Sequence, residues 1–518
     1  MRIVRTVSLI ALVFAVTLSV LSINLNPLFP IDDAYISFRY ARNWAEGAGL
    51  VFNPNERVEA NSNFLWTVLL GLMRLAGLTE PLGARLLGFV AVLLTSLLLL
   101  LMVRRRLPEA PGALALAVAL SYVLLPGTIF HALSGMETVL TALLMLGAAA
   151  AVDFEGPLSR RSWRLGLILA LISLNRPEGV VLLGFVLLAC LFALFLSRES
   201  RYLAIVPLIA SYAAIVLPFL VWRFSYYGSL VPNSLVAKGG TFNLPMLHAG
   251  IEYSLRFVMF YSPLLILSVV SFATARVPEL LFFRLPVVCT YGFMVVLGGA
   301  GDGYPFTRYL YPLVPLLAVW SAEGLWAIVQ TFERMRGRNL AWLFGLILAT
   351  VVALTEFTLL RTEYRVSGLP FGMVDGSGLR AGLARFFAQD YSPHDTGGPL
   401  RQGLGHHHLA AWLQAHASPN QLLATHEIGI VPYYSRMRVL DLYGLASREI
   451  ARAEGWPGQR AEPTFIASRR PDYLVLRLPA DSLSMSLPIF NQEHRREDYE
   501  VVQEFPYWST EILLLKRR

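Results

Sequence analysis

Long apolar runs recur along the first two thirds of the chain, and short polar links separate them. A helix needs about 20 apolar residues to cross a bilayer. The pattern predicts eleven membrane spans, at residues 6–27, 84–103, 111–127, 136–153, 165–176, 179–197, 202–222, 257–275, 286–300, 309–328 and 340–360. The first run lacks a small-residue cleavage site, so we expect a retained anchor rather than a signal peptide.

The pattern changes after residue 361. Helix-like and strand-like segments such as LLATHEIGIVPYY, YLVLRL and EILLL replace the long apolar runs. The sequence therefore predicts a polytopic α-helical membrane domain at 1–361, followed by a soluble α/β or α+β domain at 362–518.

Composition agrees with a membrane protein, because 55% of residues are hydrophobic and only 15% are charged, against about 25% charged in soluble domains. The net charge of +8 comes largely from arginines in the links between spans, at positions 104–106, 160, 161, 164, 198, 201, 334, 336 and 338. Arginine-rich links stay on the cytoplasmic side of a membrane. We therefore exclude nucleic-acid binding. The two cysteines, Cys190 and Cys289, lie in apolar runs and predict no disulfide.

Eleven spans with a cytoplasmic N-terminus place every arginine-rich link inside. They place residues 31–80, 127–135, 223–256, 299–308 and everything after 361 on the opposite, outer face. Ionisable groups near the membrane are costly and usually face a protein interior or an aqueous cavity. Unusual polar residues gather on this outer face: Asp32, Asp33, Glu59, Asn63, His131, Glu137, Arg176, Glu178, Asn233, Lys238, Asp302 and Arg308. We therefore expect any chemistry there.

The segment IDDAYISFRYARN begins the first outer loop. Residues 34–44 are expected to form a helix that Asp32 or Asp33 caps. Asp32 and Arg39 then share one helix face, about 10 Å apart along the axis. A carboxylate and a guanidinium so placed can flank a substrate, one as a base and the other as a partner for an anionic leaving group. The alternative is a helix cap beside a solvated face. Further along, FLWTVLLGLMRLAGL is expected to lie at the membrane interface.

Two other features carry candidate chemistry. Lys238 is one of only two lysines, the other being Lys516, and Gly239 and Gly240 follow it. A lysine beside glycines suits a phosphate, although a contact with lipid headgroups explains it equally well. The run at 406–408 contains three consecutive histidines. Their side chains point about 100° apart on a helix, so a shared metal ion is disfavoured.

Several stretches together resemble one family. DDAYISFRYARN and GLVFNPNERVEANSNFLW resemble the first outer loop of GT-C glycosyltransferases, especially the branch with the mycobacterial terminal arabinofuranosyltransferase. Matching stretches follow in the family's order: SGMET, NRPEG, YYGSLVPNSLVAKGG, GGAGDGYPFTRYLYP and IGIVPYYSRMRVLDLYGLASREIAR. The sequence departs from the family pattern at Ala60, where a glycine is expected, and in the loose match of GGAGDGYPFTRY.

The resemblance implies an enzyme of the bacterial plasma membrane with an outer C-terminal domain. It implies inverting transfer of a sugar, arabinofuranose by similarity, from a polyprenyl-phosphate donor to a glycan, lipid or protein acceptor. Asp32 and Asp33 match the family's acidic pair, and either is the base. Whether a divalent cation assists stays open. Arg39, Lys238, Arg308 and Arg176 are candidates to meet the phosphate. Further candidate substrate-binding residues are Tyr35, Glu59, Asn63, Trp66, His131, Glu137, Glu178, Asn233, Asp302, His426 and Glu427.

Two other classes of function compete with this interpretation. The first is a transporter or flippase of a lipid-linked glycan, which no inverted repeat in the sequence supports. The second is an assembly subunit whose catalytic site has decayed, which the full set of outer polar clusters disfavours.

Overall fold

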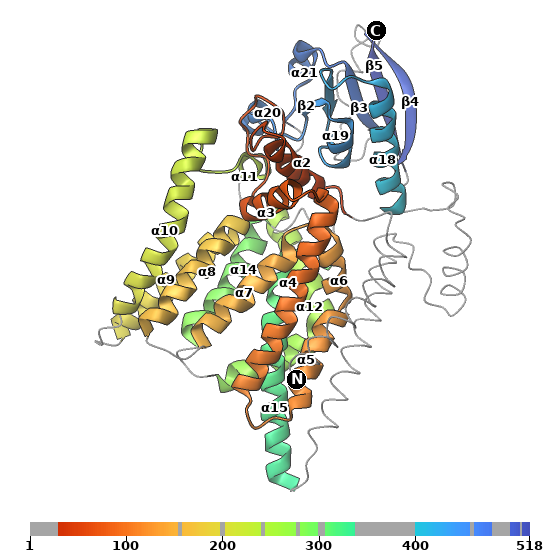
Figure 1. The fold of residues 1–518 in the computed structure, drawn as a ribbon. Helices are drawn as coiled ribbons and strands as arrows, with labels where there is room; N and C mark the ends of the chain where they lie inside the picture. Colours follow the sequence, from red (N-terminus) through yellow and green to blue (C-terminus); the bar gives the residue numbers. More distant parts are fainter. Residues whose placement is uncertain are drawn as a thin grey trace, which may run out of the picture.

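The computed structural model describes residues 30–153, 158–196, 202–239, 244–275, 280–298, 306–336, 399–455, 460–478, 498–507 and 510–518. Helices form one half of the molecule, and a domain that contains a β-sheet covers one end of them (Figure 1). The predicted spans at 6–27 and 340–360, Asp302 and the start of the predicted soluble domain lie outside the described residues.

Four helices in the described part are long and apolar enough to cross a membrane: α4 (Glu80–Arg106), α10 (Tyr202–Tyr227), α12 (Leu244–Thr274) and α15 (Val314–Arg336). A fifth span results if α5 (Gly112–Leu124) and α6 (Pro126–Leu133) count together, since they meet at a bend of 52° just before Pro126. Shorter apolar helices lie among them: α7 (Thr138–Asp153), α8 (Leu158–Asn175), α9 (Glu178–Leu196) and α14 (Leu285–Gly298). The protein is a multi-pass membrane protein, and the count of eleven spans stays a prediction.

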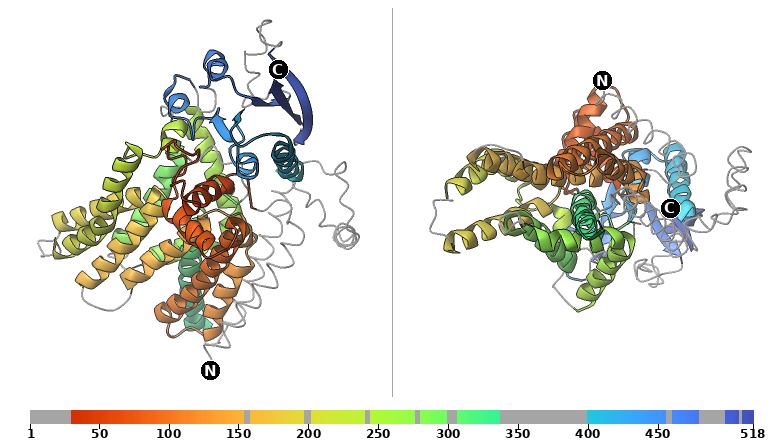
Figure 2. Two further views of the ribbon diagram at one scale, coloured as in Figure 1. Left: turned by 45° about the horizontal axis from the view of Figure 1, so that its top comes forward. Right: turned by 90° about the horizontal axis from the view of Figure 1, so that it is seen from below.

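The first outer loop folds into two short helices between the membrane helices and the C-terminal domain (Figures 1 and 2). Helix α2 (Ala34–Ala45) matches the predicted helix at 34–44, and residues 34–43 are all buried. Helix α3 (Phe64–Leu75) has 12 residues, a length of about 18 Å. That is too short to cross a bilayer core of about 30 Å, which agrees with its predicted place at the interface. Helix α11 (Asn233–Lys238) lies beside these elements.

The C-terminal domain is built on a five-stranded mixed sheet of order β2-β1-β3-β5-β4. Its elements in chain order are α18 (Pro399–His416), β1 (Leu422–Thr425), α19 (Ile430–Ser435), β2 (Arg438–Asp441), α20 (Arg448–Arg452), α21 (Pro463–Arg469), β3 (Tyr473–Leu478), β4 (Tyr499–Tyr507) and β5 (Thr510–Arg517). Strand β1 pairs in parallel with β2 and β3, whereas β5 pairs antiparallel with β3 and β4. Apolar side chains of α18 pack with those of β3 and β5 in one core. The expectation of a C-terminal domain with helices and strands is confirmed, and its place on the outer face stays a prediction.

Candidate functional site

The Asp32–Asp33 pair lies where the chain enters α2. The amide of Ile31 donates to the Ser134 carbonyl at 3.1 Å, which ties this entry to the loop after α6. Asp33 occupies the position of a helix cap, but its side chain makes no capping hydrogen bond. The expected capping role is therefore wrong for Asp33, and both carboxylates are directed to tertiary contacts instead.

Asp32, just before α2, and Arg39, on α2, both contact α19 of the C-terminal domain. Asp32 Oδ1 accepts a hydrogen bond from the Ile430 amide at 2.8 Å, at the start of α19. Arg39 Nη1 donates to the Pro432 carbonyl at 2.7 Å, near its end. The first amides of a helix lack partners within it, so Asp32 satisfies that of Ile430. The Pro432 carbonyl also accepts the Arg436 amide at 3.2 Å, so Arg39 is its second donor. A protein helix rather than a substrate therefore contacts both side chains.

Arg39 was predicted to face a phosphate, and its geometry contradicts that prediction. The side chain is only 2% exposed. It donates to the carbonyls of Phe52, Pro432 and Met437, each at 2.7 Å, and to Asn53 at 3.3 Å. Burial lowers the pKa of Arg39 to about 9, so it stays charged at neutral pH. Its hydrogen-bonding capacity is used to dock the C-terminal domain.

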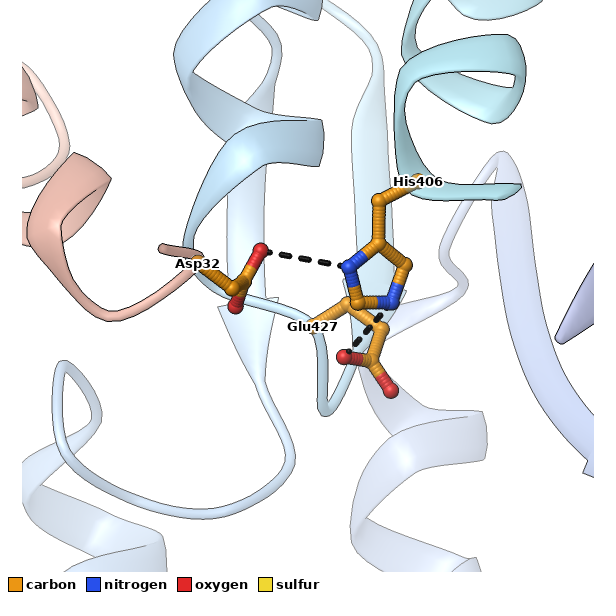
Figure 3. A group of neighbouring side chains, drawn as sticks. All are labelled: Asp32, His406 and Glu427. Atoms are coloured by element: carbon orange, nitrogen blue, oxygen red, sulfur yellow. Dashed lines mark ion pairs between the residues drawn. The ribbon is translucent and has the colours of Figure 1, made fainter. Parts of the chain in front are cut away.

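Asp32 also joins a triad with two residues of the C-terminal domain (Figure 3). His406 Nδ1 lies 3.3 Å from Asp32 Oδ1, and His406 Nε2 lies 3.0 Å from Glu427 Oε2. His406 belongs to α18, and Glu427 follows β1. Burial lowers the pKa of His406, but the Glu427 and Asp32 carboxylates outweigh it and raise that pKa to about 10. The ring is therefore an imidazolium at neutral pH.

The triad has side chains that can hold a divalent metal ion, and their ligand atoms lie within 4.8 Å of one another. The two carboxylates approach opposite nitrogens of the same ring. One ion cannot bind both nitrogens of a single imidazole ring. This arrangement therefore fits a shared proton donor better than a metal centre.

Asp33 points toward cations instead. Its Oδ2 lies 3.3 Å from Arg308 Nη1, and the Asp33 side chain is 36% exposed. Lys238, at the end of α11, is exposed to solvent. The nearby Tyr309 raises the pKa of Lys238, and Asp33 also raises it. The loss of water around the ammonium and the Arg308 cation lower that pKa, but the net shift is upward. A carboxylate, a guanidinium and an ammonium from three separate segments thus lie near one another, and Asp33 and Lys238 reach solvent whereas Arg308 is buried.

Arg176 was also a candidate to meet a phosphate, but it lies in a buried ion cluster. Its Nη1 is 3.0 Å from Glu137 Oε1, and its Nη2 is 2.5 Å from Glu178 Oε1. All three side chains are at most 6% exposed. Two carboxylates balance the single cation, so the geometry disfavours a further anion here. The cluster instead supports the first loop, because Glu137 Oε2 accepts from Asn63 at 2.8 Å and Asn63 accepts from Ser37 of α2 at 3.0 Å.

Other predicted residues connect segments rather than face the Asp33 cluster. Glu59 pairs with Arg223 at 2.8 Å. Asn233 donates to the carbonyls of Gly444 and Leu445, both at 2.8 Å. The remaining residues hold their segments in similar ways: Trp66 donates to the Gly135 carbonyl at 2.9 Å, His131 Nε2 lies 3.3 Å from the Phe306 carbonyl, and Tyr35 packs against Phe38, Tyr433 and Tyr434. His426 is half-buried beside the triad residue Glu427.

Sequence reasoning missed the role of three residues near the acidic pair. The histidine run drew attention to His406, but no sequence pattern indicates that Asp32 lies beside it. Tyr309 stands next to Arg308 in the motif TRYLYP, and Tyr443 also affects the pKa of Lys238.

A cavity of about 630 Å³ is lined by Leu98, Arg105, Gly147, Ala150, Ala151, Arg164 and Ile168. It lies at the far end of α4 and contains none of the predicted site residues.

The chain is similar to several known proteins. It is 33% identical over 226 residues to the terminal beta-(1->2)-arabinofuranosyltransferase of Mycobacterium tuberculosis. This match covers 40% of the chain and 34% of the relative, so it spans about a third of that protein's length. The resemblance seen in the sequence is thereby confirmed. Residues 399–516 match a family described as a domain of unknown function, DUF8728.

Solved structures with the same overall fold are far more distant in sequence. ArnT from Cupriavidus metallidurans, bound to undecaprenyl phosphate, aligns with a TM-score of 0.58 at 14% identity and covers 98% of each chain. The Archaeoglobus fulgidus oligosaccharyltransferase AglB, in complex with an inhibitory peptide and a dolichol-phosphate, aligns with a TM-score of 0.52 at 13% identity, over 91% of this chain and 69% of that one. The fold is of the GT-C type that the sequence predicted.

Proposed function

We propose that the protein is an inverting glycosyltransferase that uses a polyprenyl-phosphate sugar as donor. The observation that carries the proposal is the cluster of Asp33, Arg308 and Lys238 at the junction of the membrane helices and the C-terminal domain. Arginine and lysine are the side chains that bind phosphate groups. The similarity to the mycobacterial arabinofuranosyltransferase and to ArnT bound to undecaprenyl phosphate supports a lipid-linked donor.

The proposed reaction has one bond made and one broken. A hydroxyl oxygen of the acceptor attacks the anomeric carbon of the donor, and its proton passes to Asp33. The bond between the anomeric carbon and the phosphate oxygen breaks, and polyprenyl phosphate leaves. Attack from the face opposite the leaving group inverts the anomeric centre. Arg308 and Lys238 stabilise the negative charge that grows on the phosphate.

The geometry favours one of the two candidate bases. Asp32 Oδ1 is held by the Ile430 amide and by His406, whereas Asp33 is partly exposed beside the cations. We therefore propose Asp33 as the base. We further propose arabinofuranose as the sugar, a hydroxyl of a cell-envelope glycan as the acceptor, and the outer face of the bacterial plasma membrane as the place of transfer.

A reconstituted assay tests the proposal. Purified protein in lipid nanodiscs is incubated with a panel of synthetic polyprenyl-phosphoryl sugars and a glycan acceptor, and released polyprenyl phosphate is quantified. We expect release with at least one donor, and loss of release in a Asp32→Asn, Asp33→Asn double variant. Glu449→Gln is the control, because Glu449 is an exposed carboxylate paired with Arg469 in the C-terminal domain. Failure of the wild type with every donor, or equal release by the double variant, overturns the proposed function.

A further inference from the structure

His406 connects the two parts of the molecule through opposite sides of its ring. Nδ1 faces Asp32 of the first outer loop, and Nε2 faces Glu427 of the C-terminal domain (Figure 3). A neutral imidazole has one N–H donor and one acceptor nitrogen, whereas an imidazolium donates from both. Two ionised carboxylates that face both nitrogens favour a ring that donates from both. The contacts therefore favour the doubly protonated form of His406.

The charges of the triad also require this form. Glu427 is 4% exposed, His406 is fully buried, and the Asp32 side chain is 19% exposed. Two carboxylates in so little water are strongly disfavoured unless a cation lies between them. The imidazolium supplies that cation from within the chain.

The contacts on Asp32 fix the start of α2. Asp32 Oδ1 receives the Ile430 amide at 2.8 Å in addition to His406. Gly429, just before Ile430, packs so closely that a Cβ there would overlap the Asp32 carboxylate and its carbonyl oxygen. Both contacts come from the C-terminal domain, and Asp33 is the next residue along the chain. Whatever holds Asp32 therefore also sets the position of Asp33 relative to Arg308.

We propose that the C-terminal domain completes the catalytic site through His406, a positioning residue that holds Asp32 and so aims Asp33 at its substrate. This inference rests on the proposed function and gives a role to the domain that matches a family of unknown function. His406 acts through Asp32 and touches no reacting atom.

Two substitutions separate the two halves of the contact. The amide nitrogen of asparagine sits where Nδ1 does, so His406→Asn keeps a donor toward Asp32. The amide nitrogen of glutamine sits where Nε2 does, so His406→Gln keeps a donor toward Glu427 and leaves Asp32 with the Ile430 amide but no donor from residue 406. His408→Gln is the matched control, since His408 lies on the same helix and is exposed.

Kinetics give the first readout. We expect kcat to fall about 10- to 100-fold in His406→Gln, as for a misplaced catalytic group. KM for the donor should stay within about twofold, because His406 makes no contact with the donor. His406→Asn should fall several-fold less, and His408→Gln should match the wild type. Equal losses in the two His406 variants, or a larger loss in His406→Asn, overturn the proposal. A metal-ion result would also overturn the proposal. If EDTA abolishes wild-type activity and Mn²⁺ restores it, whereas the residual activity of His406→Gln responds to neither, the triad holds a metal ion.

Hydrogen–deuterium exchange gives a second readout that needs no substrate. In His406→Gln, amides of residues 31–37 and Ile430 should exchange faster than in the wild type, whereas His406→Asn and His408→Gln should change them less. If these amides keep their protection in His406→Gln, His406 does not position the loop. Faster exchange together with an inactive wild type would support the positioning role while rejecting the proposed function, so the two failures are distinguishable.

Discussion

The two carboxylates at the start of α2 are neighbours in sequence but belong to different regions. Around Asp32, a backbone amide and an imidazolium from the C-terminal domain occupy the same carboxylate oxygen. Around Asp33, the contact is an arginine at 3.3 Å, with a lysine nearby and solvent at the side chain. The first region is a joint between domains. The second region is a group of unlike charges in which Asp33 and Lys238 reach solvent.

The same contrast separates the arginines. Arg39 donates to three backbone carbonyls and Arg176 is matched by two carboxylates, whereas Arg308 lies beside the partly exposed Asp33. A charged residue is therefore not a site residue by its type alone. All three arginines are buried, and what separates Arg308 is that its carboxylate partner, Asp33, reaches solvent.

The largest expected effect comes from exchanging the acidic pair one at a time. Asp33→Asn should lower kcat about 10²- to 10⁴-fold, since it removes the proposed base. Asp32→Asn should lower it by only about 10-fold, because the amide keeps an oxygen for Ile430. Steady-state release of polyprenyl phosphate measures both. A greater loss in Asp32→Asn would reverse the assigned roles of the two regions.

A large effect on stability is expected in the buried ion cluster. Arg176→Gln leaves Glu137 and Glu178 without their cation and should cost about 3–5 kcal/mol of unfolding free energy. Arg436→Gln should cost less than about 1 kcal/mol, because the ion pair of Arg436 with Glu46 is exposed. Thermal or denaturant unfolding in detergent measures the difference. Equal costs would mean that the Arg176 cluster is not structural.

A smaller effect on binding is expected from the cations near Asp33. Arg308→Gln and Lys238→Gln should each weaken polyprenyl-phosphate binding about 10- to 100-fold, the range for a lost charged hydrogen bond. Lys516→Gln is the control, because Lys516 is the only other lysine and lies in β5. Titration with a short-chain polyprenyl phosphate measures the affinity. Unchanged affinity in both variants would exclude this cluster as the phosphate site.

The smallest expected effect is a pH dependence at the domain joint. Because the pKa of His406 is raised from 6.5 to about 10 by Glu427 and Asp32 against the effect of burial, its protonation stabilises the folded state. That stabilisation is complete below about pH 6.5 and is lost as pH rises toward 10. The thermal midpoint of the wild type should fall across this window more steeply than that of His406→Gln. Parallel curves would contradict an imidazolium at this position.

Local patterns determined much of this protein. The apolar runs predicted the membrane helices in the described residues, and IDDAYISFRYARN predicted α2 to within one residue. YLVLRL, one of the helix-like and strand-like segments of the C-terminal part, forms β3. The loop motifs also carried the resemblance that the comparison with the mycobacterial relative confirmed. Such features depend on neighbours in sequence, which the sequence displays directly.

Only the tertiary structure decided which charged residues remain available for chemistry. Periodicity predicted Asp32 and Arg39 on one helix face. Asp32 in fact precedes α2, and both residues contact α19. Helical spacing correctly disfavoured a metal site within the histidine run, but His406 meets Asp32 from a distant part of the chain. The partner of a charged group is set by packing between domains, and single-sequence patterns contain no record of which distant segments meet. The sequence thus determined the elements and the types of side chain, and the fold assigned Asp32 to the joint and Asp33 to the cations.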